Sequence, residues 1–181
     1  MPRRARSPEA TRNALLDAAC ELANQSGVFG ISVDRVIERA GVSKGGFFHH
    51  FPTKQSLLVA VVEAELDRFE ALVETCRLRD GSFARGLIRA LMEFLKSNAT
   101  MMASVNAALS FGDDVTEIVV ARRGSWLAQL QDELVPPARA QLLAHAIDGV
   151  IFSCSMRPTA PSAAEIAKIR RSLLFVLEAA A

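Results

Sequence analysis

The sequence predicts an all-α protein of about nine helices, and three observations support this prediction. Apolar residues recur with helical spacing along most of the chain. Capping residues, glycine or proline separate these periodic segments. No segment shows the alternation or bounded β-branched run of a strand. We expect a small three-helix domain over residues 1–53 and a larger helical domain over residues 54–181.

The bulk composition limits the class of protein. Half of the 181 residues are hydrophobic and the mean hydropathy is +0.21, so we expect apolar surface to be hidden in a subunit interface or a ligand cavity. No apolar run reaches the roughly 18–20 residues of a membrane span, and Met1–Arg6 lacks the apolar core of a signal peptide. The three cysteines Cys20, Cys76 and Cys154 are widely spaced, which favours free thiols in a reducing cytoplasm over disulfides or a metal site.

The first helix is predicted to begin at Ser7, a capping residue followed by Pro8 and Glu9. An apolar stripe follows it, made of Leu15, Ala18, Ala19, Leu22 and Ala23. Gly27 marks its end near residue 26.

The next two predicted helices are short and lie close together. Ser32 caps a helix whose apolar stripe is Val33, Val36, Ile37 and Ala40, and Gly41 supplies a left-handed residue to end it. Ser43 caps the next helix, and Pro52 stops it after Phe51. Two short helices joined by a glycine-containing turn form the helix-turn-helix plan, which indicates DNA binding.

The run Ser43–Lys54, SKGGFFHHFPTK, closely resembles the recognition helix of the TetR/AcrR family of bacterial transcriptional regulators. The resemblance covers roughly residues 9–60, and the remaining chain matches only in length and helical layout. Gly46 stands where the family usually has threonine, and Phe48 where it has a tyrosine whose hydroxyl touches phosphate. The resemblance implies a homodimeric regulator that answers to a ligand.

Within this run, the side chains divide into an inward and an outward set. Phe47 and Phe51 are four residues apart and are expected to point into the core. His49 and His50 are adjacent, so they do not easily share a metal ion, and no third ligand or carboxylate is near them. The predicted DNA-binding residues are Arg35, Ser43, Lys44, Gly45, Gly46, Phe48, His49, His50, Thr53 and Lys54.

The charge distribution agrees with this assignment. Residues 1–60 carry eight Lys or Arg against five Asp or Glu, whereas residues 61–181 carry thirteen against fifteen. The positive end of the chain is therefore the helix-turn-helix end. The basic arm, residues 1–7, is either a solvated tail or a contact to phosphate or the minor groove.

Beyond Thr53, four further helices are predicted before the last two. A helix over 54–78 would span ~35 Å and connect the two domains. A central helix over 83–95, a Met- and Ala-rich helix over 97–112 and a helix over 114–134 follow it. Ligand-binding residues are expected among the soft and aromatic side chains of these segments, although ordinary core packing explains such a stripe equally well. The candidates are Met92, Leu95, Met101, Met102, Phe111 and Trp126.

The last two helices are predicted over 138–156 and from a capping box at Ser162 and Glu165 onward. Gly149 in the middle of the first would cost about 1 kcal/mol, so we expect another helix to approach it closely. Two such terminal helices resemble the four-helix dimer interface of the family. Packing within one subunit is the alternative.

These observations predict a cytoplasmic DNA-binding regulator and not an enzyme, with no cofactor and no membrane partner. The partners expected are a palindromic double-stranded operator, a small and largely apolar effector, and a second copy of the chain. Control by a protein partner or by no ligand is the alternative. No catalytic set is visible in the sequence, since His145 and Asp148 form only a lone pair. A purely structural helical dimer is the remaining competitor.

Overall fold

The computed structural model describes residues 7–26, 30–97, 113–134, 136–157 and 159–178. Within these ranges the chain forms eight α-helices and no strand, which confirms the predicted all-α class. The helix predicted over 97–112 lies outside the described residues except for Ser97, where α5 ends.

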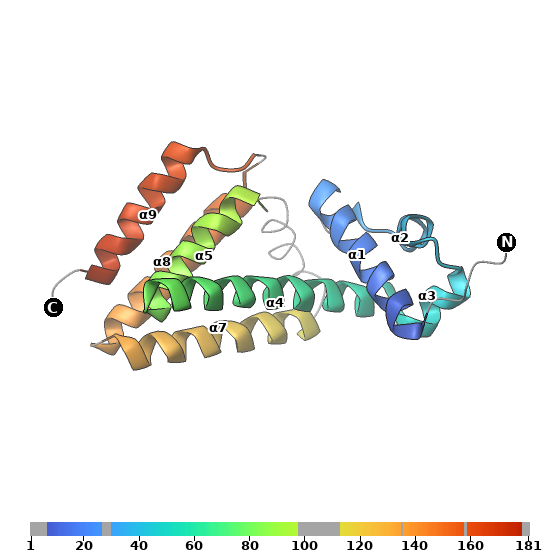
Figure 1. Cartoon of the computed structure of the whole chain (residues 1–181), viewed down its shortest axis with the longest axis horizontal. Helices are drawn as coiled ribbons and strands as arrows, with labels where there is room; N and C mark the ends of the chain where they lie inside the picture. The colour runs from blue at the N-terminus through green and yellow to red at the C-terminus, as the bar shows by residue number, and fades with distance from the viewer. Residues whose placement is uncertain (1–6, 27–29, 98–112, 135, 158, 179–181) are drawn as a thin grey trace.

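Three helices form a head at one end of the molecule (Figure 1). They are α1 (Pro8–Ser26), α2 (Val33–Ala40) and α3 (Lys44–His50), with α1 packed against the other two. Each begins at a predicted serine cap, whose hydroxyl accepts a backbone N–H three residues ahead at 3.1–3.3 Å. The predicted apolar stripes pack together in the core of the head.

The long helix α4 (Lys54–Asp80) connects the head to the body (Figure 1). Its 27 residues span about 40 Å at about 1.5 Å per residue. It ends at Asp80, two residues later than predicted, and is capped by Gly81, whose φ of 68° is the left-handed conformation that glycine favours. α4 packs on α1 of the head and on α5 and α7 of the body, so this one helix contacts both parts.

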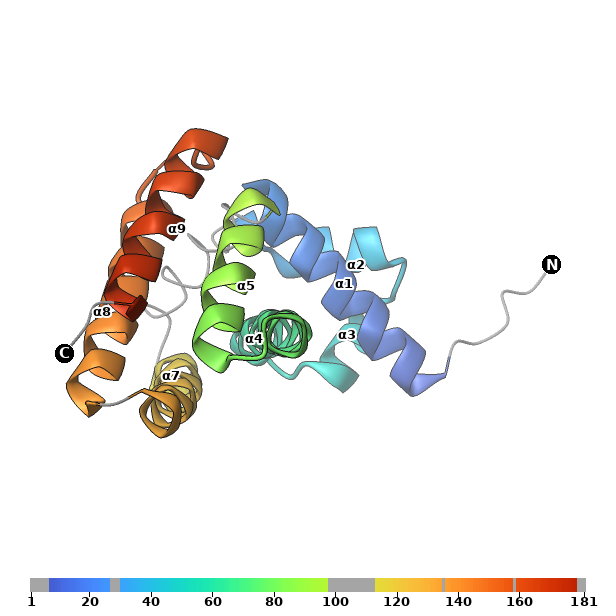
Figure 2. The same cartoon turned by 60° about the vertical axis from the view of Figure 1, so that its left-hand side comes forward.

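The body contains α5 (Phe83–Ser97), α7 (Asp113–Glu133), α8 (Pro137–Ser155) and α9 (Ala163–Glu178). Figures 1 and 2 show α7 lying along α4, with α5 packed between α4 and α9. The helix α5 is buried on nearly all sides, which confirms its predicted central position. None of the described helices combines the length and apolar character needed to cross a membrane.

Gly86 allows α4 and α5 to cross closely, and Glu133 caps the start of α5. A Cβ at Gly86 would lie 2.6 Å from the backbone nitrogen of Arg77, so only glycine allows the two helices to come this close. The carboxylate of Glu133, at the end of α7, accepts the backbone N–H groups of Phe83 and Ala84 at 2.6 and 3.2 Å. A residue fifty positions away thereby caps the start of α5.

The capping box of α9 forms as predicted. The backbone N–H of Ser162 donates to Glu165 at 2.9 Å, and the N–H of Glu165 donates to the Ser162 hydroxyl at 3.3 Å. The bond from the Ser162 N–H, with further bonds to the carboxylate from Arg157 and from the Ser162 hydroxyl, lowers the pKa of Glu165 to about 2.

The interpretation of Gly149 is wrong within one subunit. A Cβ at this position would meet nothing within 4 Å, because α8 packs through its opposite face, which carries Leu143, Ile147 and Cys154. The three cysteines are free and buried, as expected, and burial raises the pKa of each thiol.

Candidate nucleic-acid interface

The turn between α2 and α3 has a well-defined geometry. Gly41 adopts φ 62° and ψ 40°, and its N–H donates to the carbonyl of Glu38 at 3.3 Å. The N–H of Val42 donates to the carbonyl of Ile37 at 3.2 Å, which completes a Schellman-type helix end. Ser43 then caps α3, so one glycine and one serine set the angle between the two helices.

The inner face of α3 is aromatic, as predicted. The side chains of Phe47 and Phe51 are 0% and 2% exposed, with ring centroids 6.0 Å apart. The guanidinium carbon of Arg12 on α1 lies 5.4 Å from the centroid of the Phe51 ring, a cation–π contact between α1 and the end of α3. These contacts fix the rotation of α3 in the head.

The outer face of α3 presents polar groups to solvent. Lys44 and His49 are exposed, as predicted, and Phe48 is 43% exposed with its ring edge-to-face on Phe47. His50 is only partly exposed, and its ring centroid lies 5.0 Å from that of His49. The described residues contain no group of three His, Cys, Asp or Glu that could hold a metal ion.

The two glycines of α3 differ in their surroundings. A Cβ at Gly45 would meet nothing within 4 Å, so the backbone there is open to a partner. A Cβ at Gly46 would lie 2.8 Å from Cγ1 of Val42, so this glycine lets the turn pack on α3. The interpretation of Gly46 as a point of close approach to DNA omitted this packing function.

The start of α4 lies next to the end of α3 and adds backbone donors. The Thr53 hydroxyl accepts the N–H of Ser56 at 3.0 Å, and the Ser56 hydroxyl accepts the N–H of Thr53 at 3.2 Å. Lys54, the first residue of α4, is exposed. The positive end of the helix dipole and an ammonium group thus share one edge of the head, an arrangement that suits a phosphate.

Arg35 has a structural contact that the sequence did not reveal. Its Nη1 donates to the carbonyl of Gly30 at 2.6 Å and lies 3.4 Å from the Ser26 hydroxyl. The exposed guanidinium therefore holds the start of α2 to the segment that follows α1. Its predicted contact with DNA stays a prediction.

Sequence reasoning also missed a buried cluster where the head meets α4. Glu65 on α4 is 3% exposed and accepts a hydrogen bond from Arg68 at 2.5 Å. Burial raises the pKa of Glu65. Burial of Cys20 on α1, together with the charge of Glu65, raises the pKa of the Cys20 thiol to about 11. In the sequence, the only sign of this cluster is the position of Glu65 within the apolar stripe of α4.

The predicted ligand-binding residues are only partly described. Met92 and Leu95 on α5 are buried, and Trp126 on α7 packs against the same core. The indole N–H of Trp126 donates to Glu70 at 3.1 Å, and the ring of Phe69 lies 5.3 Å from those of Trp126 and Phe94. Met101, Met102 and Phe111 lie outside the described residues.

A glycine turn between two short helices, with Lys44 and His49 outward and two phenylalanines inward, defines a helix-turn-helix DNA-binding protein. Residues 15–61 match the family model of bacterial regulatory proteins of the tetR family, and residues 81–178 match the tetracyclin repressor-like C-terminal domain. The second match alone covers more than half of the chain, so this chain belongs to the TetR family of transcriptional regulators.

Two curated relatives align with part of the chain. The HTH-type transcriptional regulator RutR of Escherichia coli is 35% identical over 75 residues, which cover 41% of this chain and 35% of RutR. The HTH-type transcriptional repressor KstR2 of Rhodococcus jostii is 27% identical over 126 residues, which cover 67% of this chain and 58% of KstR2. The chain thus spans between about a third and three-fifths of the length of these relatives.

Solved structures match over almost the whole chain. A transcriptional regulator from Rhodococcus sp. Rha1 is 27% identical with a TM-score of 0.73, covering 96% of this chain and 97% of its own. The multidrug binding protein EbrR complexed with malachite green gives a TM-score of 0.73 at 23% identity, covering 91% of this chain and 96% of its own, and shows a shared fold.

Membership of the family settles the general class. Its members are transcriptional regulators and not enzymes, so this chain is not an enzyme. Regulators of the family bind DNA and small-molecule ligands and act as dimers.

Proposed function

We propose that this chain is a homodimeric repressor that releases a palindromic operator when a small, largely apolar effector binds its body. The main support for this proposal is the exposed outer face of α3. The buried Phe47 and Phe51 on the inner face hold this helix in one orientation. The names of KstR2 and KstR, both repressors, favour repression over activation. The cytoplasm, where bacterial DNA lies, is the proposed site of action.

Each head would place α3 in the major groove of one half-site. In this proposal Lys44, His49 and His50 reach base edges or phosphates, and Gly45 lets the backbone approach closely. Ser43, Gly46, Phe48, Thr53, Lys54 and Arg35 complete the proposed contact surface. Residues 1–53 would form the DNA-binding domain and residues 54–181 the effector-binding and dimerisation domain.

Operator binding of the Lys44→Ala and His49→Ala variants tests this proposal. Duplexes selected from a random library by the wild-type protein serve as the operator. Both variants are expected to lose affinity for this DNA by at least tenfold, since each good base or phosphate contact is worth about 1–3 kcal/mol and occurs twice in the dimer. Melting temperatures stay nearly unchanged, because exposed substitutions cost under about 0.5 kcal/mol.

Lys96→Ala is the matched control for Lys44→Ala, since it removes an exposed lysine from α5, outside the head and outside α8 and α9. It is expected to leave operator affinity unchanged. Lys44→Ala should also reduce the slope of log affinity against log salt by about 0.9 for each phosphate that the lysine neutralises in the wild type. Equal operator affinity of Lys44→Ala, His49→Ala and Lys96→Ala would show that α3 does not contact the operator.

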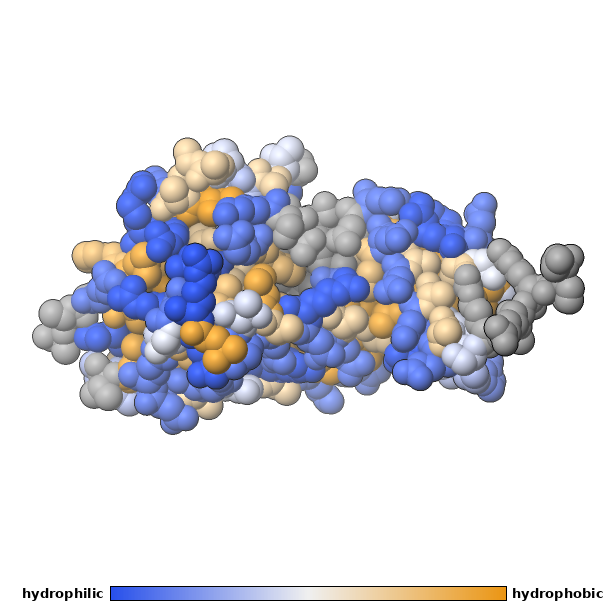
Figure 3. Space-filling view, viewed as in Figure 1, coloured by the Kyte–Doolittle hydropathy of each residue, from blue (hydrophilic) through white to orange (hydrophobic). Residues whose placement is uncertain are grey.

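The dimer is proposed to form through α8 and α9. Apolar side chains on these helices are exposed in a single subunit, namely Leu142, Phe152, Met156 and Phe175. On α8, the positions 142, 149, 152 and 156 follow a seven-residue helical repeat, so Gly149 lies within this exposed stripe. Figure 3 shows apolar side chains reaching the surface at the end that carries α8 and α9. A partner helix would then approach Gly149.

The effector is proposed to bind in the body near Met92, Leu95 and Trp126, with Met101, Met102 and Phe111 as further candidates. Support comes from the aromatic cluster around Phe69 and from the indole N–H of Trp126, which Glu70 already satisfies. Glu70 is also paired with Arg122, so no charge beside Trp126 is left free for a ligand, and burying an unpaired ligand charge would cost too much. An effector that binds the DNA-free form more tightly would lower operator affinity through α4.

Fluorescence of Trp126, the only tryptophan, measures this binding. Titration with a panel of hydrophobic compounds is expected to change the Trp126 emission, and the same compounds should release the operator. If binding never affects the operator, control by a protein partner becomes the better explanation. Binding of multiply charged metabolites alone would contradict the apolar site.

A further inference from the structure

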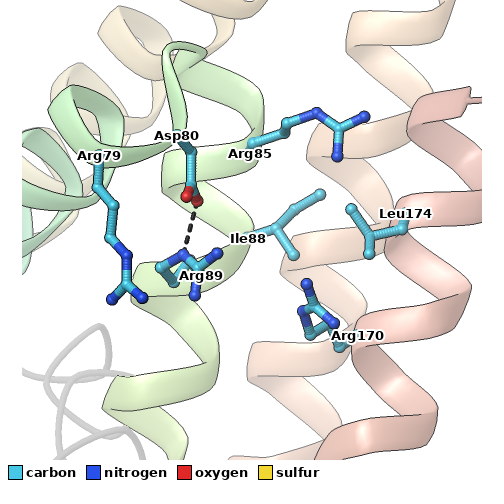
Figure 4. A pocket seen from close by; sticks show the side chains of 7 residues that line it. All are labelled: Arg79, Asp80, Arg85, Ile88, Arg89, Arg170 and Leu174. Carbon is cyan, nitrogen blue, oxygen red and sulfur yellow. Dashed lines mark hydrogen bonds and ion pairs between the residues drawn. The ribbon is translucent and has the colours of Figure 1, made fainter.

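A groove of about 420 Å³ opens at the far end of α4, between the end of α4, α5 and α9. Its lining is strongly basic: four arginines and one aspartate surround two apolar side chains (Figure 4). The arginines are Arg79 from α4, Arg85 and Arg89 from α5, and Arg170 from α9. The consecutive helices α4 and α5 and the distant helix α9 thus bring guanidinium groups to one place.

Only part of this positive charge is neutralised inside the subunit. Arg89 donates its Nε–H to Asp80 at 2.6 Å, and Arg85 donates to Glu178 at 2.8 Å. In the described ranges Arg79 and Arg170 make no hydrogen bond or ion pair within 4 Å, but their charges, after the hydrogen bond from Arg89, help to lower the pKa of Asp80. Four arginines against two carboxylates, Asp80 and Glu178, leave an excess of positive charge, which favours an anionic ligand.

Arg170 occupies an unexpected position on α9. The helix packs on α5 through Ile166, Leu173 and Leu177, which are all buried. Arg170 is four residues after Ile166 and three before Leu173, so it lies on the same stripe of α9. An apolar residue would normally continue this stripe. Arg170 and the neighbouring Arg171 are both exposed, but Arg171 lies off the stripe.

Leu174 supplies the accessible apolar surface of the groove. Leu174 on α9 is half-buried, and its side chain points toward Ile88 of α5, which is buried beneath the groove (Figure 4). A ligand with a charged end and a short apolar part therefore matches the lining better than an inorganic ion does. Guanidinium groups bind carboxylate and phosphate with paired, charge-assisted hydrogen bonds.

We propose that this arginine groove is a binding site for a small organic anion, whose carboxylate or phosphate contacts Arg79, Arg89 and Arg170 and whose apolar part covers Leu174. The site is separate from the proposed apolar effector site beside Trp126. It lies at the opposite end of α4 from the head, and its occupancy is measured without DNA. If the repressor proposal fails, the anion-binding proposal is therefore unaffected. If the anion-binding proposal fails, the repressor proposal is likewise unaffected.

Calorimetric titration of the full-length protein with hexanoate, hexyl phosphate and inorganic phosphate tests the site. The matched variants are Arg170→Gln and Arg171→Gln, which remove one positive charge from adjacent positions of α9. Arg170→Gln is expected to weaken binding of hexanoate or hexyl phosphate at least tenfold, a loss of about 1.4 kcal/mol. Arg171→Gln is expected to leave binding within about twofold of the wild type. The preferred headgroup distinguishes a carboxylate from a phosphate ligand.

Circular dichroism checks that each variant is folded, and Arg79→Gln provides a second test on a different helix. Equal weakening by Arg170→Gln and Arg171→Gln would overturn the proposal, because it would show only a general surface charge. If inorganic phosphate binds as tightly as hexyl phosphate, the apolar part of the ligand contributes nothing to binding. That result would contradict a site for an organic anion. No measurable binding of any of the three compounds would also overturn it.

Discussion

Replacing Phe47 with alanine is expected to unfold the head and abolish operator binding. The Phe47 side chain is fully buried, and its ring packs on those of Phe48 and Phe51. Truncating a buried phenylalanine costs about 3–5 kcal/mol, from the transfer free energy of the removed atoms and from the cavity that remains. A three-helix head encloses few other large side chains, so this cost is a large part of its stability. Urea unfolding and hydrogen exchange of the α1–α3 amides measure it.

Phe48→Ala is the matched control, because it makes the same change at the next residue. Phe48 is exposed, so its truncation is expected to cost under about 1 kcal/mol and to leave the head folded. Any effect of Phe48→Ala on operator affinity would then report direct binding of DNA by this side chain and not a change in folding. If the two variants are equally destabilised, the inward and outward faces of α3 are assigned incorrectly.

Phe152→Glu is expected to separate the dimer and, for that reason, to remove high-affinity operator binding. Phe152 is 61% exposed in one subunit and lies beside Gly149 on the open face of α8. In a two-fold interface the substitution occurs twice, and each copy removes buried apolar area and buries an unpaired carboxylate. A combined cost of at least about 4 kcal/mol raises the dissociation constant of the dimer roughly a thousandfold. Analytical ultracentrifugation measures the change.

Leu78→Glu serves as the control for charge alone. Leu78 on α4 is 71% exposed and lies outside α8 and α9, so this variant is expected to remain dimeric and to bind the operator. Circular dichroism should show a folded subunit in both cases. A dimeric Phe152→Glu protein would mean that the subunits meet through another surface.

Local sequence determined most of the helices and the inner face of the recognition helix. Ser32, Gly41 and Ser43 act within a few residues of their own position, so their capping functions follow from the sequence alone. The spacing of Phe47 and Phe51 likewise implies that both are buried together. Sequence also indicated the family, since the run Ser43–Lys54 lies within the matched segment.

The tertiary structure alone decided the features that depend on distant segments. Glu133 caps α5 from fifty residues away, and Gly86 is required only because α4 crosses at that point. Gly46 looked like an opening for DNA, but it lies against Val42. The arginine groove combines three helices, and no local pattern shows that Arg79, Arg89 and Arg170 share one space. Helix periodicity determines which face of each helix is buried, whereas the packing of the helices determines which residue meets which.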